Sequence, residues 1–201
     1  MKKIFIGVGV FILLVIVILV ATGSFKFSAS IGEKENVIPE SMVPEGWKKY
    51  TSGEFGYSIA HPSDWNLTDN NTQNSRDLFI MALRGVAFVS VAGFHDPSIN
   101  SVTAIEASIA EYKASFENKP EELLNNFKTQ INGDIGYFGA DGRMRTDEAV
   151  YQFLERGMLT TDGRVLIMRG AVDTSETSLT QEAFDIHVAM VNQIMDSFNI
   201  E

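Results

Sequence analysis

The three histidines of the chain, His61, His95 and His187, are its first candidates for chemistry, because imidazole serves as a general base or a metal ligand near neutral pH. His61 precedes a proline at the end of an expected strand, and His95 opens a His-Asp-Pro turn. His187 lies beside the apolar face of an expected helix. None of them has a second ligand at the short spacing typical of zinc sites. The sequence therefore predicts structural roles for them and no metal site.

Signatures of nucleophilic catalysis and phosphate binding are missing from the sequence. It contains no Gly-x-Ser-x-Gly, Ser-x-x-Lys or His-Glu-x-x-His motif. Gly133, Gly136, Gly139 and Gly142 lack the spacing and the following lysine of a phosphate loop, so a turn or an irregular edge strand is the favoured interpretation. The chain has no cysteine, which excludes thiol chemistry. We predict a protein that is not an enzyme, with no catalytic residue and no cofactor.

A polar run from Asp69 to Asp77 offers oxygen atoms at alternate positions, as calcium loops do. It lacks the glycine and the terminal glutamate of such loops, so a polar surface loop is favoured and no metal ligand is predicted. Two Asn-x-Thr triplets begin in the same stretch, at Asn66 and Asn70. They are the candidate glycosylation sites of the chain, provided that its host glycosylates proteins.

Two further groups of side chains have alternative interpretations. Arg143 and Arg145 could grip an anionic ligand, since the arginine fork suits carboxylates, although neighbouring acidic residues favour a mixed-charge hairpin surface. Five aromatic residues stand in or near two expected strands, where they could line a ligand pocket. A core role is favoured for them, because aromatics that alternate along strands are mostly buried. They are Trp47, Tyr50, Phe55, Tyr57 and Trp65.

The elements that position these residues are expected to be hairpins and helices. Three hairpins are predicted, the last around an Asp-Gly pair that supplies the positive φ angles of a tight turn. They join residues 47–50 to 57–60, 78–83 to 87–94, and 150–159 to 165–172. The glycine-rich stretch 132–146 is expected to be an irregular edge.

Helices are predicted in three places. The first begins at a capping box, Thr103 to Glu106, and ends or is interrupted at Pro120, and a short helix is expected over 121–130. The last begins at a capping box formed by Ser178 and Gln181, and its apolar residues recur at helical spacing: Phe184, Val188, Val191, Met195 and Phe198. This order predicts an α+β fold in which helices sandwich an antiparallel sheet.

The N-terminal segment predicts where this domain is held. Lys2 and Lys3 precede an uncharged apolar run from Ile4 to Ala21, which as a helix would rise roughly 27 Å, close to the hydrocarbon thickness of a bilayer. A single transmembrane anchor is favoured over a signal peptide, because signal peptides have shorter apolar runs. Cleavage near Gly23, followed by secretion, is the alternative. The lysines predict a cytoplasmic N-terminus in the cell membrane and an extracytoplasmic C-terminal domain.

Composition divides the chain further. Residues 22–44 are polar and small with two prolines, which predicts a flexible tether. Residues 45–201 have the length of one domain and carry 12 Lys and Arg against 23 Asp and Glu. This acidic balance opposes binding to nucleic acid and to anionic lipid, and it suits a basic partner or simple solubility.

The strings GWKKY at Gly46, EFGYSI at Glu54 and HPSDW at His61, together with the closing Ser197-Phe198, resemble the PsbP-like superfamily over residues 47–200. The resemblance implies an antiparallel sheet sandwiched by helices. It also implies a binding or assembly role: one member attaches to photosystem II, and a fold relative binds a nuclear-transport GTPase. Neither partner is transferred, because fold does not dictate function.

Together these features predict a membrane-anchored, extracytoplasmic, non-catalytic module for a protein partner in the cell envelope. The alternative is an exported protein that binds a small ligand or a metal ion, through the Asp69–Asp77 run or through a pocket beneath the central helix.

Overall fold

The computed structural model describes residues 43–71, 75–82, 85–119, 121–176 and 179–200. The expected anchor and nearly all of the expected tether lie outside these residues, so their predictions remain predictions. Within the described ranges, no helix combines the length and the apolar character needed to cross a membrane.

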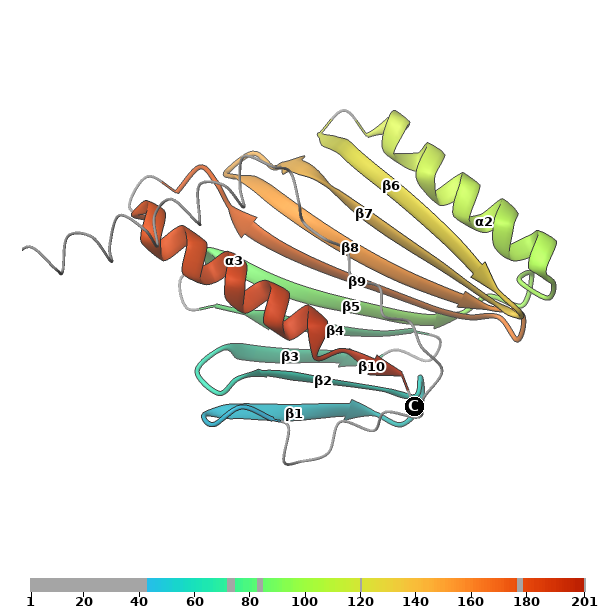
Figure 1. Ribbon diagram of the computed structural model, residues 1–201, viewed down its shortest axis with the longest axis horizontal. Coiled ribbons are helices and arrows are strands. Elements are labelled where there is room, and N and C mark those ends of the chain that lie inside the picture. Colours follow the sequence, from blue (N-terminus) through green and yellow to red (C-terminus); the bar gives the residue numbers. More distant parts are fainter. Residues whose placement is uncertain (1–42, 72–74, 83–84, 120, 177–178, 201) are drawn as a thin grey trace, which may run out of the picture. The chain divides into compact units, whose positions relative to one another are not determined.

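Two antiparallel sheets and two α-helices form the described domain, in agreement with the predicted α+β class (Figure 1). The small sheet has the order β1-β2-β10, and the large sheet has the order β3-β4-β5-β9-β8-β7-β6. The bounds of the strands are β1 (Trp47–Ser52), β2 (Tyr57–Pro62), β3 (Asn66–Asn71), β4 (Ser75–Met81), β5 (Ala87–His95), β6 (Glu122–Asn132), β7 (Ile135–Arg145), β8 (Val150–Thr160), β9 (Arg164–Asp173) and β10 (Asn199–Ile200). The helices are α2 (Val102–Ser115), the short 3-10 turn η3 (Phe116–Asn118) and α3 (Gln181–Asp196).

The three predicted hairpins are confirmed as the pairs β1–β2, β4–β5 and β8–β9. The turn of the last hairpin places Gly163 at φ 86°, a conformation that favours glycine. A Cβ atom there would also lie 2.6 Å from the carbonyl oxygen of Asp96. Both the backbone conformation and this close approach therefore disfavour a larger residue.

The two helices lie on opposite faces of the large sheet. On one face a Cβ at Gly136 would meet Ile105 of α2 at 2.2 Å, and on the other a Cβ at Gly170 would meet Val191 of α3 at 2.4 Å. The β8 residue opposite Gly136 is also opposite Val165 of β9, so Gly136 and Val165 face the same side of the sheet. Val165 lies five residues before Gly170 on β9. Because side chains alternate along a strand, an odd separation reverses the face. We call these surfaces the α2 face and the α3 face.

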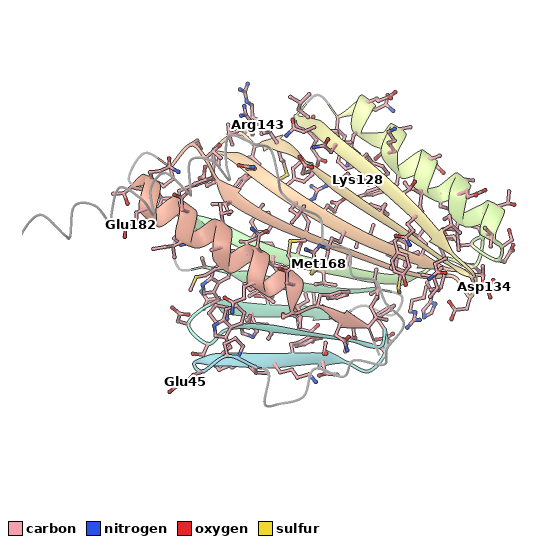
Figure 2. The ribbon with its side chains drawn as sticks, in the orientation of Figure 1. Glu45, Lys128, Asp134, Arg143, Met168 and Glu182 are labelled. Atoms are coloured by element: carbon pink, nitrogen blue, oxygen red, sulfur yellow. The ribbon has the colours of Figure 1, made fainter. Side chains whose placement is uncertain are left out.

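The main core fills the α3 face, where α3 and the small sheet cover the large sheet. Met168 of β9 is buried in it (Figure 2), together with side chains of β2, β4, β5 and α3. The prediction of an aromatic core is confirmed: Phe55, Tyr57 and Trp65 are buried there, and Trp47 and Tyr50 pack against them.

The last residues of the domain complete the small sheet. Asn199 and Ile200 form β10 and pair with Ser58 and Tyr57 of β2. Just before them, the hydroxyl of Ser197 accepts a hydrogen bond from the amide of Ala60 at 2.9 Å. Residues from the two ends of the domain therefore form one sheet.

The predicted helix over 121–130 is wrong, because these residues form the edge strand β6. A register shift between Leu124 and Asn126 explains the error. Leu124 pairs with Gly142 and Phe127 with Ala140, so the irregularity brings two apolar residues three apart onto the same face. In a regular strand they would face opposite ways, and their spacing therefore looks helical.

Two other stretches are more regular than predicted. The glycine-rich stretch is not an irregular edge, because β7 pairs along its whole length with both β6 and β8. The polar run from Asp69 to Asp77 is not a single loop, because its ends belong to the paired strands β3 and β4.

The helix starts also differ from the predicted ones. The side chain of Ser101, not Thr103, caps α2 by accepting from the amide of Ala104. Thr180 caps α3 by accepting from the amide of Ala183, while the predicted cap at Ser178 lies outside the described residues.

Candidate functional site

The helix α2 packs against β6 and β7 (Figure 1), and a groove lies next to it on the α2 face of the large sheet. One hollow of about 320 Å³ is lined mainly by β5 and β9, with one residue each from α2, β7 and β8. A second hollow of about 260 Å³ is lined by one side of α2 and by apolar strand residues. Both include Tyr112 and Ile167 in their walls, so they adjoin. We call the two hollows together the α2 groove.

Apolar side chains make most of the wall of the α2 groove. In the first hollow they are Phe88, Ala92, Met144 and Ile167. In the second they are Phe94, Ile99, Ile109, Phe138, Leu159, Val165 and again Ile167. β5 contributes to both hollows because its residues 88, 90, 92 and 94 all face the α2 side, as the two-residue period of a strand requires.

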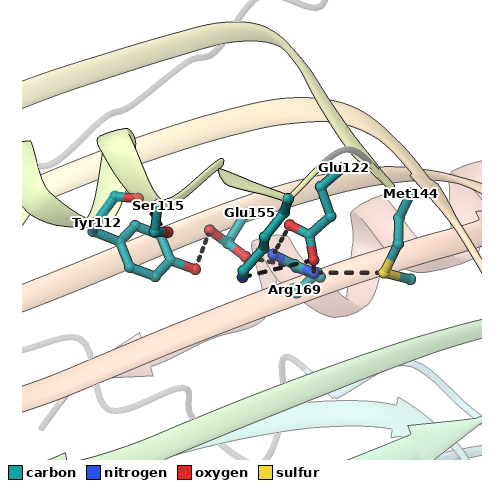
Figure 3. Close-up of polar contacts among 7 residues, drawn as sticks. Tyr112, Ser115, Glu122, Met144, Glu155 and Arg169 are labelled. Atoms are coloured by element: carbon teal, nitrogen blue, oxygen red, sulfur yellow. Dashed lines mark hydrogen bonds and ion pairs between the residues drawn. The ribbon is translucent and has the colours of Figure 1, made fainter. Parts of the chain in front are cut away.

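A polar cluster closes one end of the groove, and we call it the Arg169 cluster: Tyr112, Glu122, Glu155 and Arg169 (Figure 3). The guanidinium of Arg169 donates through Nε to Glu155 Oε2 at 2.6 Å. Its Nη1 and Nη2 donate to the two oxygens of Glu122 at 3.1 and 3.2 Å. The hydroxyl of Tyr112 donates to Glu155 Oε1 at 2.8 Å. Four elements, α2, β6, β8 and β9, are thereby joined.

Burial governs the electrostatics of this cluster. Glu155 is 1% exposed and the side chain of Arg169 is 16% exposed. Burial by itself would lower the pKa of Arg169, but the charge of Glu155 and the hydrogen bonds that Arg169 donates to both carboxylates raise this pKa above its ordinary value, so Arg169 stays a cation. Burial and the neighbouring charge of Glu155 raise the pKa of the Tyr112 hydroxyl, which therefore remains a donor.

Every carboxylate oxygen of the cluster already accepts a hydrogen bond from within it. Both oxygens of each carboxylate accept from Arg169 or Tyr112, and the guanidinium also lies over the ring of Phe153, with Cζ 4.8 Å from the ring centroid. A general base needs a lone pair within reach of a substrate proton. This geometry favours holding a surface in shape over moving protons.

The three histidines lie on separate elements, β2, β5 and α3. His61 is buried, and this burial is the main cause that lowers its pKa. The charge of Lys48 also lowers that pKa, whereas a hydrogen bond with the carbonyl of Pro62 raises it by less than burial lowers it. His95 stacks on Phe55, and His187 Nδ1 lies 2.7 Å from the carbonyl oxygen of Ala183. Among the described residues, no group of three or more acidic or histidine side chains could hold a metal ion.

The other sequence candidates lie away from the α2 groove. Asn66 and Asn70 are exposed on the edge strand β3, and their glycosylation remains a prediction. Arg143 is exposed near the end of β7 (Figure 2), and Arg145 is exposed at the last position of that strand. Asp141 accepts from Asn126 across the β6–β7 pair.

The Arg169 cluster was not predicted, although the sequence carries a signal for it. Glu155 and Arg169 each interrupt an alternation of small or apolar residues along a predicted strand. The observed three-residue loop sets Glu155 opposite Arg169, whereas a two-residue Asp-Gly loop would set it opposite Gly170. The charged pair follows from the sequence only once the loop length is known.

We found no protein-family model that matches the chain and no characterised protein whose sequence matches it. Solved structures do match. Cyanobacterial PsbP (CyanoP) from Synechocystis aligns over 85% of this chain and 99% of its own, with 14% identity and a TM-score of 0.52. The described domain therefore has the PsbP-like fold, and the predicted resemblance is confirmed at the level of the fold.

Two other structures are more distant. A Bacteroides thetaiotaomicron protein aligns over 77% of this chain and 48% of its own, with 12% identity and a TM-score of 0.44. LpqN of Mycobacterium tuberculosis, which is involved in cell envelope biogenesis, aligns over 79% and 80% with 13% identity and a TM-score of 0.35. These similarities are too low to add to the argument.

Proposed function

We propose that this protein is a non-catalytic binding module that receives a protein partner in the α2 groove, at the outer side of a cell membrane to which residues 4–21 anchor it. The observation that carries the proposal is an apolar groove whose only buried charged cluster is saturated within the described domain. Such a surface offers contact area and a fixed shape, while the two acids and the one base of the Arg169 cluster are already engaged with one another.

The PsbP-like fold supports a binding role but does not select the partner, since one fold hosts many functions. Lys2 and Lys3, which precede the apolar N-terminal run, support a place outside the cytoplasm for the domain through the positive-inside rule of membrane orientation. A small-ligand role is the second candidate, because the first hollow has the volume of a small-molecule site.

The test is site-specific photocrosslinking of the full chain in its own membranes. A photoreactive residue at Ser108, which lines the second hollow, should give one discrete protein adduct, identified by mass spectrometry. The matched position is Glu182, which is exposed in the first turn of α3 (Figure 2) and should give no such adduct. Equal adducts from both positions, or none from Ser108, would overturn the proposal.

Catalysis is tested separately. The purified chain should turn over no substrate in a broad hydrolase screen. Turnover that disappears in Glu155→Gln, while the variant keeps its wild-type fold, would contradict a non-catalytic role.

A further inference from the structure

The α2 groove combines apolar walls with an excess of acidic groups. Asp96 and Glu111 line the second hollow, and no cationic side chain shares that lining. Hydrogen bonds from the hydroxyl and the amide of Ser98 hold the pKa of Asp96 below its usual value, so its carboxylate is charged at neutral pH. Glu111 is exposed on α2. A ligand in this hollow therefore meets an apolar floor and two acidic groups.

The charged groups of the first hollow, unlike those of the second, are paired with one another. Arg169 and Glu155 line it, but the two carboxylates of the cluster already engage the guanidinium. Lys119 lies 3.9 Å from Glu122 and is 42% exposed, outside that lining. The remaining walls are apolar, so this hollow suits an apolar side chain and offers an anion no unpaired cation.

The dimensions of the groove fit a short extended peptide. The wall of the second hollow uses residues 108 to 115 of α2, which span roughly 10 Å at 1.5 Å per residue. About three residues of an extended chain cover the same distance. A longer extended chain can continue from this wall into the first hollow, because the two hollows share Tyr112 and Ile167, and so place a side chain in each.

We infer that the α2 groove binds an extended segment of a partner protein that places an apolar side chain in the first hollow and a lysine or arginine in the second. This inference rests on the proposed binding function and names the chemistry of its partner. Electrostatic complementarity selects the basic residue, and burial of the apolar side chain supplies most of the affinity.

The experiment uses the full chain in a neutral detergent and fluorescence anisotropy of labelled octapeptides. The first probe carries two leucines and two lysines separated by serines. In the second probe glutamates replace the lysines, and in the third serines replace the leucines. The first probe should bind at least about tenfold more tightly than either of the others, and its affinity should fall with added salt.

Matched variants locate the binding on the groove. Glu111→Lys should weaken the first probe about tenfold, since it reverses a charge on the groove wall. Glu106→Lys makes the same charge change at an exposed position of α2 outside the groove lining, and should change affinity less than about twofold. Ala92→Phe fills the first hollow and should also weaken binding about tenfold, with the melting temperature measured to confirm folding.

Equal effects of the two α2 variants would overturn the inference in favour of non-specific charge attraction. Full affinity in Ala92→Phe would show that the first hollow is unused, and binding of a small amine without peptide binding would replace the peptide with a small ligand. Failure of all three probes, combined with a Ser108 crosslink, would refute the basic segment while leaving the binding module intact.

Discussion

Removing the charge of Arg169 is the sharpest test of how the α2 face is held together. The change Arg169→Met keeps a long, flexible, apolar side chain and deletes the guanidinium. It leaves Glu155, which is 1% exposed, without a cation, and it leaves Glu122, whose side chain is 10% exposed, with only Lys119 at 3.9 Å. Breaking a buried ion pair from one side costs about 3–5 kcal/mol, because the remaining charge is buried without compensation.

The matched control is Arg156→Met on the neighbouring strand position of β8. Arg156 pairs with Asp196, whose side chain is 66% exposed, and donates to the carbonyl oxygen of Met195. Exposed ion pairs contribute little, so this change should cost about 1 kcal/mol. The same replacement on the two faces of one sheet therefore separates a buried charge from an exposed one.

The assay is urea unfolding of the full chain in a mild detergent, followed by the fluorescence of Trp47 and Trp65. At pH 7 Arg169→Met should lose at least about 2 kcal/mol more than Arg156→Met. Equal losses of stability in the two variants at pH 7 would contradict this expectation.

Three further predictions concern other parts of the domain. Burial lowers the pKa of His61 in the folded chain, so as the pH falls below about 6.5 the imidazole binds a proton more readily in the unfolded chain. The folded state therefore loses stability as the pH falls. Melting temperatures measured down to pH 5 should therefore fall less in His61→Gln than in the wild type, and equal slopes would refute this. Gly157→Ala places a Cβ 1.9 Å from an aromatic ring atom of β7 and should cost about 1–3 kcal/mol in urea unfolding, whereas Gly53→Ala, with nothing within 4 Å, should be nearly neutral. Ser101→Ala should lower the free energy of unfolding by about 1 kcal/mol and Thr103→Ala by much less. A larger loss in Thr103→Ala would instead support the capping box predicted from the sequence.

The sequence predicts best the elements that alternate regularly or end in a recognisable turn. The β8–β9 hairpin follows from two alternating runs around Asp162-Gly163, and α3 follows from apolar residues at helical spacing. Both signals are local, so they persist without knowledge of the tertiary structure. The fold class follows from such elements taken together.

Elements that depend on distant pairing are predicted poorly. The strand β3 is polar and exposed along most of its length, so it lacks the alternation that marks a half-buried strand. In β6 the irregularity at Asn125 lets apolar residues three apart in the sequence face the same side of the strand, and that sequence spacing is typical of a helix. The α2 groove depends on how β5 and β9 meet α2, which no local pattern in the sequence encodes.

The pairing of β10 with β2 has a consequence for biogenesis. The small sheet needs residues 199 and 200, so it cannot close before the whole domain has left the ribosome or the translocase. Contacts between segments so far apart in sequence form late and slowly. Until residues 199 and 200 reach it, the β1–β2 hairpin has no third strand. During that interval the small sheet is incomplete and open to chaperones and proteases.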